Sequence, residues 1–124
     1  MYRNIVCDED YRMTDNNWLS QAKRGLIELC ILNLLHRQTM YGYQIVKQLT
    51  LVPGLVVTAG TVYPLLARLK SGALVTSSLE ESSQGPARRT YVLTPAGKEY
   101  MLRINASWRD IVSAMDQFIA PERG

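Results

Sequence analysis

Residues 58–72 read TAGTVYPLLARLKSG, and this stretch decides the fold. At about 100° per residue its four large aliphatic side chains share one narrow face, which predicts a helix over residues 59–71 packed on one side. Thr58 is the expected N-cap, with its hydroxyl accepting a backbone N–H of the first turn. Gly72 is expected to end the helix in the left-handed conformation. Pro64 is awkward in this assignment, because it removes one helical hydrogen bond.

Two further helices are predicted before this segment. The first runs from about residue 17 to residue 37, and its apolar side chains cover nearly every direction around the axis, which indicates burial on several sides. The second spans about residues 41–49, where apolar residues recur every four positions. The three apolar residues 55–57 are long enough for a very short strand.

A β-hairpin is predicted after residue 72. Residues 73–81 and 88–93 are extended runs that flank a turn at Gly85-Pro86. Thr94-Pro95 then opens the last helix, with threonine at the N-cap and proline at the first helical position. The predicted fold class is therefore mainly α with a small β wing, that is, a winged helix-turn-helix over residues 16–94 followed by a long C-terminal helix.

The last helix has the most regular hydrophobic pattern in the chain. Its apolar residues are spaced three and four apart, the pattern of a coiled-coil seam. A helix over residues 95–120 would be about 37 Å long, more than so small a domain covers, so we expect it to form a homodimer. The alternative is that it packs back on the first helix of its own subunit. The expected dimer interface consists of Met101, Ile104, Trp108, Ile111, Val112, Met115, Phe118 and Ile119.

The distribution of charge favours a polyanionic partner. The net charge is +3, and no Asp or Glu occurs between Glu28 and Glu80, although four basic residues do. Such a segment repels a nucleic acid less, and the alternative is chance clustering. The outer face of the predicted helix 59–71 and the basic hairpin tip could then reach phosphates or base edges of double-stranded DNA. Two alternatives stay open: Arg68 could pair with a carboxylate, and Tyr63 could be half-buried packing.

Other classes of protein are disfavoured by the sequence. The chain has one histidine, His36, and no phosphate-binding loop, zinc-protease motif or nucleophile elbow, so we expect no enzyme, cofactor or metal. Cys7 and Cys30 are too few for a disulfide framework, and Cys30 is expected to be a buried thiol. No apolar run is long enough to span a membrane, and a cytoplasmic protein is expected. Residues 1–15 are expected to form a flexible arm.

Three blocks of the sequence together resemble the PadR family of transcription regulators. They are YGYQI from residue 41, GTVYPLLARL from residue 60 and GPARRTYVLTPAG from residue 85. The short chain is similar to the compact branch of the family, which includes the lactococcal multidrug-resistance repressor. The resemblance implies a homodimeric repressor of an inverted-repeat operator. The resemblance and the outer face of the predicted helix 59–71 together give the candidate DNA contacts, which are Tyr41, Thr58, Thr61, Tyr63, Arg68, Lys70, Arg88 and Arg89.

Trp108 is a candidate ligand contact through the same resemblance. In the multidrug repressor a tryptophan of the C-terminal helix from each subunit sandwiches flat aromatic drugs, and the segment SWR from residue 107 matches that neighbourhood. This implies a planar aromatic small-molecule effector, since aromatic faces suit planar and cationic ligands. The alternative is that Trp108 is plain dimer core.

A second class of function also fits the sequence. A winged-helix dimer could serve as a protein-interaction or ligand-sequestering module without binding DNA. Such a module has no need for the basic residues of the predicted helix 59–71 and of the hairpin together, whereas a repressor does. Their removal therefore discriminates between the two functions.

Overall fold

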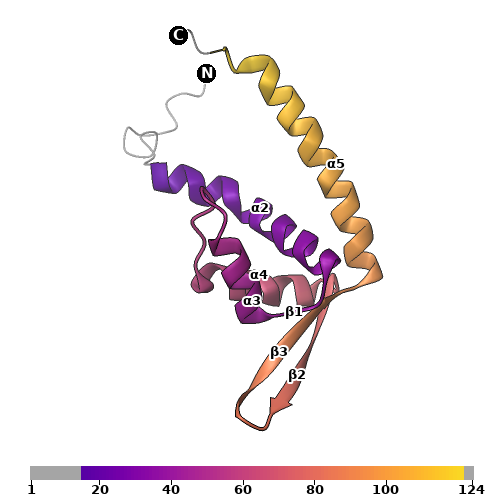
Figure 1. Ribbon diagram of the computed structural model, residues 1–124. Helices are drawn as coiled ribbons and strands as arrows, with labels where there is room; N and C mark the ends of the chain where they lie inside the picture. The colour runs from indigo at the N-terminus through magenta and orange to yellow at the C-terminus, as the bar shows by residue number, and fades with distance from the viewer. Residues whose placement is uncertain (1–14, 122–124) are drawn as a thin grey trace, which may run out of the picture.

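The computed structural model describes residues 15–121, which form four helices and one three-stranded sheet (Figure 1). The expected arm lies outside the described residues, with Cys7 in it, apart from Asp15, which begins the first described helix. The mainly α fold with a small β wing is confirmed. The elements in chain order are α2 (Asp15–Arg37), β1 (Met40–Tyr41), α3 (Gly42–Thr50), α4 (Ala59–Ser71), β2 (Val75–Ser82), β3 (Gly85–Leu93) and α5 (Pro95–Phe118).

The core lies where α2, α3 and α4 meet the base of the sheet. Ile31 and Leu32 of α2 are fully buried, as are Ile45 of α3 and Leu66 of α4. The predicted inner face of α4 is confirmed, since its four large aliphatic residues are all buried, while Pro64 lies exposed inside an unbroken helix. Each buried aliphatic side chain of this size stabilises the fold by about 1.5–3 kcal/mol, which holds α4 on the other two helices.

The bounds of α4 are as predicted, but the details of both caps differ from the prediction. Thr58 is the N-cap residue in extended conformation, but its hydroxyl accepts no backbone N–H and lies 3.4 Å from the hydroxyl of Thr61. Gly72 has a φ of −84°, and the left-handed residue is Ala73, with a φ of 61°. The helix ends at Ser71 as predicted, and the N–H of Leu74 donates to the carbonyl of Leu69 at 3.0 Å, so a six-residue hydrogen-bonded turn follows with its left-handed residue one position later than expected.

The sheet has the antiparallel order β1–β3–β2, and β1 was not predicted. The strand expected at residues 55–57 was wrong, because Val56 has a φ of 48° and the segment is a loop. The ammonium of Lys23 in α2 donates to the carbonyls of Leu55 and Val56 and so binds this loop. The hairpin turn is shorter than expected, since β3 already begins at Gly85.

Hydrogen bonds of Thr94 fix the start of α5. The predicted N-cap is confirmed: the Thr94 hydroxyl accepts the N–H of Gly97 at 2.9 Å and donates to the carbonyl of Ala73 at 2.8 Å. The Thr94 N–H donates to the carbonyl of Leu74 at 3.1 Å. Gly97 packs so closely that a Cβ there would lie 2.0 Å from the Leu74 carbonyl oxygen. The direction of α5 is therefore set by the turn that follows α4.

A pair of amides holds α5 beside α2. The Nδ2 of Asn33 donates to the Oδ1 of Asn105 at 2.9 Å, and the Nδ2 of Asn105 donates back at 3.0 Å. Beyond this pair α5 diverges from α2, and its last turns stand away from the rest of the described chain (Figure 1). No helix within residues 15–121 is long and apolar enough to cross a membrane.

Candidate nucleic-acid interface and adjoining cavity

The outer face of α4 is exposed and carries no carboxylate. Thr61 and Lys70 are exposed on it, and Thr58 is exposed at its beginning. Exposed hydroxyl and ammonium groups beside a small residue such as Gly60 allow close approach to a groove wall and contact with phosphates. This face is the surface that helix-turn-helix proteins present to the major groove.

Tyr63 joins this surface to α3. Its side chain is 43% exposed, yet its Cε1 would lie 2.8 Å from a Cβ at Gly42, the first residue of α3. A side chain at residue 42 would therefore push the Tyr63 ring out of its place. Tyr91 lies against the same glycine and is 7% exposed, and its burial raises the pKa of its phenol. Tyr63 thus packs against α3 on one side, as in the alternative considered from sequence, and is also exposed on the outer face, where it remains a candidate contact.

An aromatic cluster joins β1 and α3 to the wing. The rings of Tyr41 and Tyr43 stack with centroids 5.9 Å apart and planes at 12°, and the guanidinium of Arg88 lies 5.6 Å from both centroids. The Tyr41 hydroxyl donates to a carboxylate oxygen of Glu80 at 2.6 Å. Cation–π contact with the stacked tyrosines holds Arg88 in the outer half of the wing.

Glu80 raises the pKa of Tyr41. The hydrogen bond to the Glu80 carboxylate is the largest cause, its negative charge adds to the effect, and the charge of Arg88 opposes it. The phenol of Tyr41 therefore stays protonated and oriented. Sequence reasoning missed Tyr43 and Glu80. The alternation of Tyr41 and Tyr43 was visible, but the pairing of Glu80 with Arg88 follows from the strand register, which the shorter turn sets.

The two wing arginines lie on different faces of β3. They were expected together at the hairpin tip, but they stand inside the strand, opposite Glu80 and Leu79, and successive strand residues point to opposite faces. Arg88 lies over the tyrosine pair, whereas an Nη of Arg89 donates to the Ser77 hydroxyl at 3.2 Å. The cause is again the short turn, which places Gly85-Pro86 within the strand.

Arg68 pairs with a carboxylate, which was the alternative considered from sequence. Its Nε lies 3.4 Å from Oε2 of Glu28 on α2. The Arg68 side chain is 68% exposed and the Glu28 side chain only 15%. The outer nitrogens of the guanidinium thus remain accessible to solvent while the pair joins α4 to α2.

The apolar stripe of α5 divides into a covered and an uncovered part. Met101 is buried in the core of its own chain and Ile104 packs partly against it. The rest of the predicted dimer interface is exposed, from 37% at Val112 to 84% at Phe118. Its members are Trp108, Ile111, Val112, Met115, Phe118 and Ile119.

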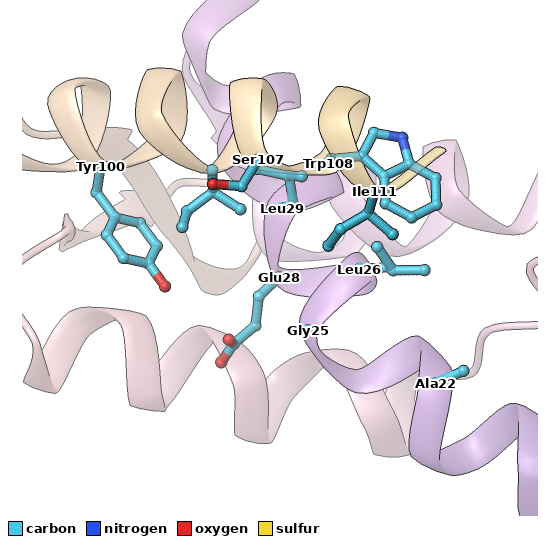
Figure 2. A pocket seen from close by; sticks show the side chains of 10 residues that line it. Ala22, Gly25, Leu26, Glu28, Leu29, Tyr100, Ser107, Trp108 and Ile111 are labelled. Atoms are coloured by element: carbon cyan, nitrogen blue, oxygen red, sulfur yellow. The ribbon is translucent and has the colours of Figure 1, made fainter. Parts of the chain in front are cut away.

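A cavity of about 320 Å³ lies between α2 and α5 (Figure 2). Trp108, Ile111 and Leu26 gather at one end of the cavity. The Glu28 carboxylate and the Tyr100 hydroxyl lie together at the other side, away from these three apolar side chains. Its lining consists of Ala22, Gly25, Leu26, Glu28, Leu29, Tyr100, Ile104, Ser107, Trp108 and Ile111. Glu28 is the one charged residue in this lining.

Three helices, a hairpin wing and an exposed, carboxylate-free face on α4 define the winged helix-turn-helix class. Residues 31–103 match the transcriptional regulator PadR-like family, and the chain belongs to it. Members of this family are transcriptional regulators that bind DNA and are not enzymes.

Solved structures of the family are similar to this chain. A PadR-like transcription factor from Bacteroides fragilis is 37% identical, with 83% of this chain and 99% of that chain covered and a TM-score of 0.70. A PadR family regulator from Clostridium difficile is 33% identical, with 76% of this chain and 98% of that chain covered and a TM-score of 0.68. A PadR-like regulator from Bacillus cereus is 30% identical, with 82% of this chain and 99% of that chain covered and a TM-score of 0.71.

Proposed function

We propose that this PadR-like regulator is a cytoplasmic, ligand-responsive repressor that binds an inverted-repeat operator as a homodimer. The observation that carries the proposal is the combination of an exposed basic face on α4 and the wing with an uncovered apolar stripe on α5. A two-fold dimer through α5 repeats the α4 face, and two equal faces require a symmetric operator.

The uncovered stripe of α5 supports the homodimer. Trp108, Met115 and Phe118 are 40%, 49% and 84% exposed on a helix that its own chain covers only over the first turns. Contiguous exposed apolar surface of this kind marks an interaction site, and the spacing of three and four suits a second copy of the same helix. We expect Met115→Glu to give monomers in sedimentation equilibrium. Gln117→Glu introduces the same charge beside the stripe and should leave the dimer intact; a dimeric Met115→Glu variant contradicts this interface.

The basic groups near the wing support DNA binding. Arg88, fixed over Tyr41 and Tyr43, and Arg89 are candidate phosphate contacts together with Lys70. The experiment is fluorescence anisotropy with the DNA upstream of the chain's own gene and with a scrambled duplex, at two salt concentrations. Removing one side chain that binds a phosphate makes the slope of log K against log salt shallower by about one.

The matched variants remove equal charge from two places. Arg88→Ala with Arg89→Ala should weaken operator binding and give the shallower slope. Arg103→Ala with Arg109→Ala, both on α5, should change neither. Wild-type affinity and slope in the first variant would show that the wing makes no DNA contact. No binding by the wild-type dimer to either duplex would favour the interaction module without DNA binding.

The cavity between α2 and α5 supports ligand responsiveness. It is mostly apolar and has Trp108 in its lining, which suits a planar aromatic effector. Quenching of tryptophan fluorescence by a flat aromatic compound should persist in Trp18→Phe and disappear in Trp108→Ala. Persisting quenching in Trp108→Ala would place the compound elsewhere.

A further inference from the structure

We propose that Glu28 couples the cavity between α2 and α5 to the DNA-facing helix α4, so that a ligand with an apolar body and a positive charge weakens DNA binding by taking the carboxylate from Arg68. This inference rests on the proposed function, because it describes how the same cavity would regulate the same interface. The coupling residue is a positioning residue: it touches Arg68 and not the DNA.

Glu28 is the one charged residue of the described chain that both lines the cavity and pairs with a side chain of α4. It lines the cavity, and its Oε2 lies 3.4 Å from Nε of Arg68 on α4. That oxygen is buried and has no hydrogen-bond partner among the residues that the structure describes. The contact with Arg68 is an ion pair and not a hydrogen bond, so the carboxylate is under-satisfied. An ammonium group that enters the cavity therefore gains a strong, charge-assisted contact with the Glu28 carboxylate.

The geometry of the Arg68 guanidinium decides the sign of the coupling. Its Nε faces Glu28, while the side chain as a whole is 68% exposed near the end of α4. The negative charge of Glu28 draws the Nε side of the guanidinium toward α2 and leaves its outer nitrogens free for a phosphate. Taking Glu28 away from Arg68 thus loosens a candidate DNA contact, so cation and DNA bind antagonistically, each weakening the other by the same factor.

The shape of the cavity decides the class of ligand. The apolar end at Trp108, Ile111 and Leu26 fits an aromatic or aliphatic body (Figure 2). The opposite side offers the Glu28 carboxylate and the Tyr100 hydroxyl and no cation. A volume of about 320 Å³ suits a small molecule of one or two rings with an ammonium group. A neutral molecule of the same shape lacks the group that competes with Arg68.

The experiment compares 1-naphthylmethylamine, charged at neutral pH, with its neutral counterpart 1-naphthalenemethanol. In the full-length protein without DNA, the amine should shift the NMR signal of the Arg68 Nε–H group, and the alcohol should not. With operator DNA, saturating amine should weaken binding of the wild type about five-fold, the lower limit of typical allosteric coupling. These two readouts separate the inference from the proposed function, because the first needs no DNA.

Variants distinguish positioning from simple charge. Glu28→Gln and Glu99→Gln each remove one negative charge, and Glu99 is exposed on α5. Charge alone would strengthen DNA binding in both; we expect Glu28→Gln instead to bind DNA about five-fold more weakly and to lose its response to the amine. Arg68→Lys, which keeps the charge without the Nε fork, should lose the same response, with circular dichroism confirming the fold of each variant. An Arg68 signal unmoved by the amine, or a Glu28→Gln variant that behaves as Glu99→Gln does, would overturn the proposal.

Discussion

Replacing Gly97 by alanine is expected to destabilise the protein, although alanine is the better helix former. The added Cβ would lie 2.0 Å from the carbonyl oxygen of Leu74 and 2.8 Å from Cδ1 of Leu93. The Leu93 side chain can rotate, but the Leu74 carbonyl is backbone and accepts the N–H of Thr94 at 3.1 Å. Relieving this clash requires the first turn of α5 to move by about 1 Å, which strains the hydrogen bonds made by Thr94.

The magnitude follows from these contacts. Overpacking against backbone costs about 3 kcal/mol, and the weakening of two hydrogen bonds costs up to about 2 kcal/mol more. The better helix propensity of alanine offsets about 1 kcal/mol. The net loss is about 2–4 kcal/mol, equivalent to a fall in Tm of about 8–16 °C for a domain of this size.

The assay is urea and thermal unfolding followed by circular dichroism, at one fixed protein concentration because association would add to the stability. Gly25→Ala is the matched control, since Gly25 is also helical and a Cβ there meets nothing within 4 Å. It should stabilise the protein by about 0.5–1 kcal/mol. If Gly97→Ala unfolds within about 0.5 kcal/mol of the wild type, the close approach of α5 to the turn after α4 is not rigid, and the reasoning fails.

Three further outcomes are expected from contacts that hold the elements together. Thr94→Val removes the hydroxyl that caps α5, so the free energy of unfolding should fall by about 1–2 kcal/mol in urea titration; an unchanged midpoint would contradict the cap. Asn105→Ala leaves Oδ1 of Asn33 without its donor, while Nδ2 of Asn33 keeps its hydrogen bond to the Leu29 carbonyl; it should cost about 1–3 kcal/mol, and equal stability would mean that water replaces the lost donor. Glu80→Gln should lower the pKa of Tyr41 toward its ordinary value of 10.0, followed by NMR of labelled tyrosine. The folded pKa of Tyr41 is raised, so the stability linked to this hydrogen bond is present below pH 10.0 and is lost as the pH rises through the raised pKa. A Glu80→Gln variant with the wild-type titration curve of Tyr41 would contradict this pairing.

The helices were predictable because their burial pattern is local. The inner face of α4 follows from the spacing of Val62, Leu65, Leu66 and Leu69 alone, and that face is buried as expected. The ends of helices and the strands depended on contacts between distant residues. Met40 and Tyr41 become a strand because they pair with Tyr91 and Thr90, about fifty positions further along the chain, which no local pattern reveals.

The candidate site was predictable in its residue types and less so in its geometry. Arg88 and Arg89 were expected side by side because they are adjacent in sequence, and a turn shorter than expected put them into a strand with opposite faces. The pairing of Arg68 with Glu28 was weighed only as an unnamed carboxylate, because a contact between α2 and α4 depends on how the helices cross.

The outer half of the wing has a bearing on how such regulators diversify. Every residue from Leu79 to Arg89 is exposed, so no side chain there contributes to the core. Substitutions, and even added residues at the tip, therefore cost the fold little. Under the proposed function, drift in these few positions would give lineages of this fold new operators, with the helices beneath them unchanged.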